Sequence, residues 1–171
     1  MVKFLERDDL LARVKTEIET DGTVRKAAAE ASKEAFFLDP GLTDEPMRTW
    51  LDMVYDSVQS VCEDLAYRAV RVDPERVDPM LADDFTAILE TVEASAFVVA
   101  DLTQVRPSDL YTLGHANGLG KPAIVIARTG TELPFPLADS ATAFWEPDDM
   151  LSFRERLWAK VSRIAWKAGA D

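Results

Sequence analysis

Two uninterrupted apolar runs, separated by a segment of helix length, constrain the fold of this chain more than any other feature. The runs are Ala96–Ala100 (AFVVA) and Ala123–Ala127 (AIVIA). Strands without polar alternation are usually covered on both faces, as in parallel sheets. Parallel neighbours need a long crossover, and residues 107–119 can supply it as a helix. We therefore predict a central strand–helix–strand unit.

Further apolar segments alternate with helical patterns along the chain, and each crossover is long enough for a right-handed unit. The predicted strands are 35–38, 67–72, 96–100, 123–127 and 141–145, and the predicted helices are 47–65, 81–93, 107–119 and 150–168. This alternation predicts an α/β fold, a flavodoxin-like three-layer sandwich. Its five-stranded parallel sheet has the order 2-1-3-4-5.

Residues 1–33 precede the first predicted strand and are interpreted as a separate unit. Apolar residues share one face of 3–19, Asp21-Gly22 breaks the pattern, and 24–33 favours a second helix. We predict an N-terminal helical hairpin attached to a domain spanning 34–171. The hairpin either covers a sheet edge or contacts a partner, including another copy of the chain.

The charge of the chain narrows the classes of partner. A formal net charge of −12 disfavours electrostatic binding to a nucleic-acid polymer or to an anionic membrane. The first residues lack the apolar centre of a secretory signal, and the single cysteine, Cys62, fits a buried site in a reducing compartment. We expect a cytoplasmic protein. No metal-ligand cluster is evident, and we predict neither a metal nor a cofactor.

Polar residues follow three of the predicted strands. In a 2-1-3-4-5 sheet the ligand crevice lies where the crossovers part, outside the carboxyl ends of the strands. The predicted ligand-binding residues there are Asp39, Pro40, Asp73, Asp101, Thr103, Ser108 and Gly114. Carboxylates can accept hydrogen bonds from ribose hydroxyls. The alternative role of the aspartates is turn formation and helix capping.

The segment 107–119 has the features of a helix whose amino end faces that crevice. Pro107 suits the first helical position, and the free amides that follow can bind an anion. Asp109 and Thr112 are three residues apart and hence neighbours on one helix face. Three glycines are expected to let a backbone or ligand approach closely, the last also ending the helix: Gly114, Gly118 and Gly120.

The stretch VVADLTQVRPSDLYTLGHANGLGKPAIVIA, residues 98–127, resembles the nucleoside 2-deoxyribosyltransferase-like superfamily, including its TIR-like bacterial members. Members of the family read Ala-Asp-Leu-Thr, then Asn-Pro-Asn, Tyr-Glu-Leu-Gly and Gly-Lys-Pro in the same order. The similarity covers roughly residues 35–145. It implies a nucleoside, nucleotide or NAD as ligand.

The resemblance also implies where the reactive centre would lie. In catalytic members, the Glu of Tyr-Glu-Leu-Gly attacks the anomeric carbon of a nucleoside and the base leaves. Here Tyr111-Thr112-Leu113-Gly114 occupies that place, so Thr112 stands at the position of the nucleophile. Asp109, one turn earlier, is a candidate for a relocated nucleophile. The candidate catalytic residues are therefore Asp109, Thr112 and Tyr111.

Three functional hypotheses remain open from the sequence. The first is a nucleoside- or nucleotide-binding protein with a degenerate catalytic centre. The second is an N-glycosidic-bond-cleaving enzyme, a hydrolase or deoxyribosyltransferase acting on a nucleoside, nucleotide or NAD through Asp109 or another acid. The third is a protein-interaction or assembly domain, because a fold does not by itself imply a function.

Overall fold

The computed structural model describes residues 32–72, 81–134, 137 and 142–168. The predicted hairpin lies outside these ranges except for its last two residues, and Asp73 lies outside them as well. Within the described ranges, no helix is both long enough and apolar enough to span a membrane.

The described residues form a five-stranded parallel sheet, and its order, β2-β1-β3-β4-β5, confirms the predicted topology. The strands are β1 (Glu34–Leu38), β2 (Arg68–Arg71), β3 (Phe97–Asp101), β4 (Ala123–Arg128) and β5 (Ala143–Trp145). β1 lies between β2 and β3, so that Phe36 pairs with Val70 on one side and with Val98 on the other. The first and third strands are therefore neighbours, as the predicted crevice requires.

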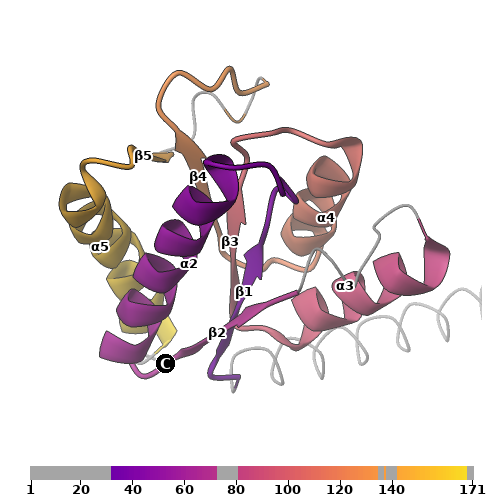
Figure 1. The fold of residues 1–171 in the computed structure, drawn as a ribbon. Helices are drawn as coiled ribbons and strands as arrows, with labels where there is room; N and C mark the ends of the chain where they lie inside the picture. The colour runs from indigo at the N-terminus through magenta and orange to yellow at the C-terminus, as the bar shows by residue number, and fades with distance from the viewer. Residues whose placement is uncertain (1–31, 73–80, 135–136, 138–141, 169–171) are drawn as a thin grey trace, which may run out of the picture.

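Within the described ranges, four helices cover the sheet and complete the three layers (Figure 1). They are α2 (Met47–Asp64), α3 (Ala82–Ala94), α4 (Pro107–Gly118) and α5 (Met150–Ala168). α2 and α5 pack against one face and against each other, and α3 and α4 pack against the opposite face. The flavodoxin-like class predicted from the sequence is confirmed.

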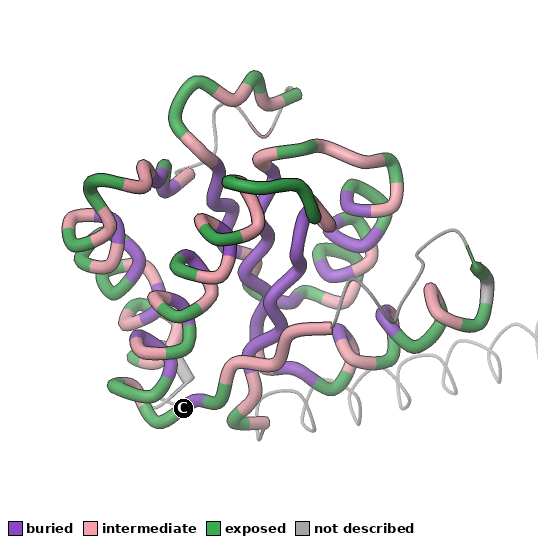
Figure 2. The backbone as a smooth tube through the Cα atoms, viewed as in Figure 1, coloured by how far each residue is buried: buried purple, intermediate pink, exposed green. Residues whose placement is uncertain are grey.

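The central strands are buried on both faces, which explains their uninterrupted apolar sequence (Figure 2). Successive side chains of a strand point to opposite faces of the sheet. Phe37 and Val99 accordingly belong to the core beneath α2 and α5, whereas Phe36 and Val98 belong to the core beneath α3 and α4. Each face has its own apolar core, so neither helical layer can be removed without exposing one.

Two sequence predictions differ from the structure in detail. β3 extends to Asp101, which was predicted to follow the strand, because Asp101 still pairs with Ile126 of β4. At Gly114 and Gly118 an added Cβ would meet no atom within 4 Å, so no backbone of the described residues approaches there, and close approach of a ligand stays a prediction. Gly120, at φ +69°, follows the end of α4 as predicted.

Cys62 on α2 is fully buried, and burial raises the pKa of its thiol to about 12. Because the thiolate is the reactive species, we expect the native protein to resist iodoacetamide near neutral pH. Mass spectrometry should show full alkylation only after denaturant is added. Glutathione in the same tube serves as the control, and comparable labelling rates for the two thiols would contradict the burial of this side chain.

Candidate functional site

Charged side chains are paired at the carboxyl ends of β1 and β2. Asp39 follows β1 and is buried, and its Oδ2 accepts a hydrogen bond of 2.7 Å from Nε of Arg71. Its Oδ1 accepts a 2.6 Å bond from the backbone N–H of Gly41. Arg71, the last residue of β2, also donates from Nη1 to Oδ1 of Asp52 on α2 at 2.7 Å. One arginine thus joins two strands and a helix while balancing the charge of the buried Asp39 carboxylate.

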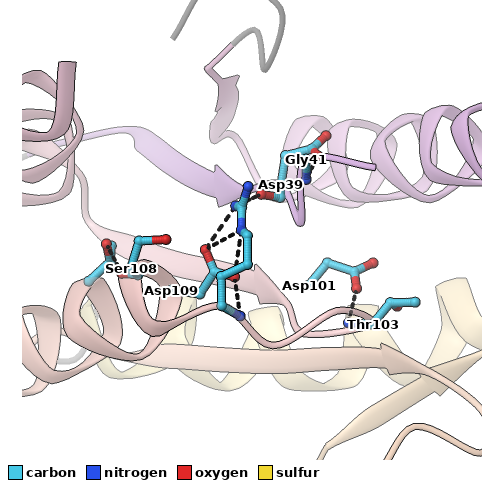
Figure 3. Close-up of polar contacts among 8 residues, drawn as sticks. Asp39, Gly41, Asp101, Thr103, Ser108 and Asp109 are labelled. Carbon is cyan, nitrogen blue, oxygen red and sulfur yellow. Dashed lines mark hydrogen bonds and ion pairs between the residues drawn. The ribbon is translucent and has the colours of Figure 1, made fainter. Parts of the chain in front are cut away.

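A second arginine lies at the topological switch point, the place beside the ends of β1 and β3 where the crossovers part in opposite directions. Arg106 caps α4, and its Nε and Nη2 donate to the Asp109 carboxylate at 3.0 and 2.8 Å. Nη2 also donates to the carbonyl oxygen of Asp39 at 2.8 Å. Figure 3 shows Asp39 and Asp109 on either side of this contact. The crevice expected between the loops is therefore crossed by a guanidinium.

Asp109 is almost fully buried, with an exposed fraction of 1%. Besides the two side-chain donors, the backbone N–H of Arg106 donates to its Oδ2 at 3.0 Å, which satisfies one free amide at the start of α4. Charge-assisted hydrogen bonds of this kind are shorter and stronger than bonds between neutral groups, so they fix the position of the carboxylate. Its position at the amino end of a helix adds a favourable interaction with the helix dipole.

Asp101 lies apart from Asp39 and Asp109 (Figure 3), and it pairs with Ile126 of β4. It is fully buried, and its two oxygens accept hydrogen bonds from the Thr103 N–H at 2.8 Å and from Nε1 of Trp145 at 3.0 Å. The Thr103 hydroxyl in turn accepts a bond from the Arg128 N–H at 2.9 Å. Burial raises the pKa of Asp101 to about 7, although hydrogen bonds from Thr103 and Trp145 act in the opposite direction.

Two of the three candidate catalytic residues point in different directions on α4. Thr112 is buried, and its hydroxyl donates a 2.9 Å hydrogen bond to the carbonyl oxygen of Ser108, one turn earlier. Tyr111 is 61% exposed, and its ring packs edge-on against Phe85 of α3 with 5.3 Å between the ring centroids. The Tyr111 phenol and the Thr112 hydroxyl therefore do not lie in one common site.

The structure therefore brings together only part of the predicted ligand site. Asp39 and Asp109 meet through Arg106, and Asp101 with Thr103 forms a neighbouring buried unit. Pro40 is buried beside Asp39 along the chain, and Gly114 lies exposed on α4. Within the described ranges, no group of three His, Cys, Asp or Glu side chains is arranged to hold a metal ion.

Several residues of this network were missed by the sequence analysis. Arg106 carried a usable signal, because it precedes a proline at a helix start and lies three residues before Asp109, within reach of an ion pair. Arg71 carried a weaker one, as a basic residue at the carboxyl end of a predicted strand. Trp145 and Asp52 gave none, since each reaches its partner across the sheet or from a helix.

No protein family matches the chain, and no curated protein matches it. Among solved structures, the chain is similar to a 2-deoxyribosyltransferase from the psychrotolerant bacterium Bacillus psychrosaccharolyticus. The superposition has a TM-score of 0.49 and 18% sequence identity, and it covers 71% of this chain and 90% of that protein. By its own topology, the chain is a flavodoxin-like α/β protein with a charged switch point.

The buried Asp101 predicts a pH-dependent stability. Its pKa of about 7 in the folded state lies above the unfolded value of 3.8, so between these values only the folded state holds the proton. The contribution of Asp101 to the free energy of unfolding should therefore fall as the pH rises from about 4 to about 7. Asp101→Asn removes this component, which denaturant unfolding of both proteins at several pH values will measure. A stability difference that stays constant with pH would refute it, and Asp83→Asn at an exposed site is the control.

Gly41 lies at φ +72° against the Arg106 guanidinium, where an added Cβ would overlap Nη1. Gly130, at φ +88°, has no atom near the Cβ position and isolates the cost of the backbone conformation. We expect Gly130→Ala to destabilise by about 1–2 kcal/mol, and Gly41→Ala by roughly 1–3 kcal/mol more because Arg106 must move. Equal losses in denaturant unfolding would show that Arg106 does not occupy the place described.

Proposed function

We propose that the chain is a nucleoside- or nucleotide-binding protein of the nucleoside 2-deoxyribosyltransferase-like superfamily with a degenerate catalytic centre. The observation that carries the proposal is the state of Thr112, which stands where the sequence resemblance places the nucleophilic carboxylate. Its hydroxyl is buried and donates to the Ser108 carbonyl. A threonine nucleophile needs a neighbouring base to take its proton, and this hydroxyl is hydrogen-bonded to a backbone oxygen instead.

Groups suited to recognition remain at the switch point. Flavodoxin-like sheets bind ligands outside the carboxyl ends of the strands that flank this point. Carboxylates such as Asp39 can accept hydrogen bonds from ribose hydroxyls, and guanidinium groups such as Arg71 and Arg106 suit the oxygens of a phosphate. To these we add the residues first proposed from the sequence: Pro40, Asp73, Asp101, Thr103, Ser108 and Gly114.

The alternative is an active glycosidase or transferase in which Asp109 replaces the missing carboxylate. For Asp109 to attack an anomeric carbon, the Arg106 guanidinium would have to leave both carboxylate oxygens. That movement would break charge-assisted hydrogen bonds and leave a buried, unpaired charge, which costs several kcal/mol. The pairing therefore favours binding over turnover. An assembly domain with no small-molecule ligand is the third possibility.

A thermal-shift screen with nucleosides, nucleoside monophosphates and NAD tests the proposal. A compound that binds the folded state raises the melting temperature, by the equivalent of about 2.7 kcal/mol at one hundred times its Kd. We expect stabilisation by at least one compound, with no free base above the protein-free blank when the same mixtures are analysed by chromatography. The screen thus separates binding from turnover in one set of samples.

Two variants and one control distinguish the proposed function from the enzymatic alternative. Base release by the wild type that disappears in Asp109→Asn would establish the enzymatic alternative, with Asp83→Asn on the exposed side of α3 as the matched acid control. Binding without base release, weakened in Arg106→Gln, supports the proposed function. No stabilisation by any compound would remove the proposal in favour of an assembly domain.

A further inference from the structure

The outer face of α5 carries three large apolar side chains that the rest of the described chain does not cover. The helix buries its inner face against the sheet, yet Leu151, Trp158 and Trp166 are 74%, 46% and 80% exposed. Intervals of seven and eight residues correspond to about two turns, so the three side chains form one stripe along the helix. α5 lies at the edge of its layer beyond α2, with exposed positions on its outer side (Figure 2).

The order of residues along this stripe is self-complementary. Leu151 lies seven residues before Trp158, and Trp166 lies eight residues after it. If a second α5 packs antiparallel about a two-fold axis beside Trp158, Leu151 of each copy comes opposite Trp166 of the other. The two Trp158 rings then meet near the axis. An isologous contact requires this kind of match between a surface and itself.

The charges of the same face follow the same symmetry. Glu155 lies three residues before Trp158 and Arg163 lies five residues after it, both exposed. The antiparallel arrangement places Glu155 of one copy about two residues, or roughly 3 Å along the helix axis, from the level of Arg163 in the other, and the two-fold axis repeats the pair. Neither side chain forms an ion pair with another residue in the described part of the chain. The pairing gives charge complementarity at both ends of the contact.

A shallow hollow on the surface of α5 supplies the complementary shape. It is lined by Leu151, Arg154, Glu155 and Trp158, and Trp166 of a second copy would arrive beside its Leu151 end. Arg154 is held at one edge of the hollow by Asp64 of α2, with 3.1 Å between Nη2 and Oδ2.

We propose that α5 is the interface of a homodimer in which two copies pack their α5 helices antiparallel about a two-fold axis at Trp158. The occupant of the face is a second copy, because apolar and charged residues match under one symmetry operation. A pair of single helices buries less than the about 1,200 Å² of a standard interface, so we expect a micromolar Kd. The proposal is independent of the function of the switch point.

Sedimentation velocity from about 1 μM to about 1 mM brackets such a Kd and tests the proposal. We expect a concentration-dependent monomer–dimer equilibrium in the wild type. Trp158→Ser should raise the Kd at least about tenfold, because central aromatic side chains dominate interfaces. Leu81→Ser, at another exposed apolar position on the opposite face of the sheet, is the matched control and should leave the Kd unchanged. Circular dichroism and melting temperature establish that each variant is folded.

Exchanging the charges of Glu155 and Arg163 tests whether the outer face of α5 binds a second copy of the chain. Glu155→Arg and Arg163→Glu should each weaken the dimer, and the double variant should restore it, because the exchanged charges still meet across the axis. A wild type that stays monomeric overturns the proposal, and so does a dimer that is insensitive to these changes. Binding of the monomer to anionic phospholipid vesicles, lost in Trp158→Ser, would overturn it in favour of a membrane surface.

Discussion

Burial of the central strands on both faces is the constraint on which the rest of this structure depends. β1, β3 and β4 lie between two apolar cores, so no polar side chain can occupy their interiors without a partner. Polar groups are therefore confined to the strand ends. The order of the strands then gathers the ends of β1 and β3 at one point, with the loop after β1 and the amino end of α4 beside it.

The same burial decides the character of the acids that gather there. A carboxylate in a largely water-excluded place must be paired, hydrogen-bonded or neutral. Asp39 is paired with Arg71, Asp109 with Arg106, and Asp101 accepts hydrogen bonds from Thr103 and Trp145. These interactions tie neighbouring elements together, which gives each acid a structural role whatever it also does to a ligand. Recognition of a sugar or a phosphate is compatible with such a network, whereas a nucleophile must first be released from it.

Much of the fold could be predicted from the sequence because its signals are local. Unbroken apolar runs indicate doubly covered strands, helical spacing indicates the helices between them, and Gly120 indicates the end of α4. The same reasoning placed Asp39, Asp101 and Asp109 at the carboxyl edge. The partners of Asp39 and Asp101 could not be predicted, because Arg71 and Trp145 reach them from strands distant in sequence.

The sequence by itself determined the class of fold, the order in which strands and helices alternate, and the residue types available at the strand ends. Only the tertiary structure decided which charges from distant segments neutralise one another, and that an arginine crosses the switch point. The physical reason is the distance along the chain over which each kind of interaction acts. Periodicity and propensity act between neighbours along the chain, whereas the pairing of buried charges depends on which distant segments the sheet brings within about 3 Å.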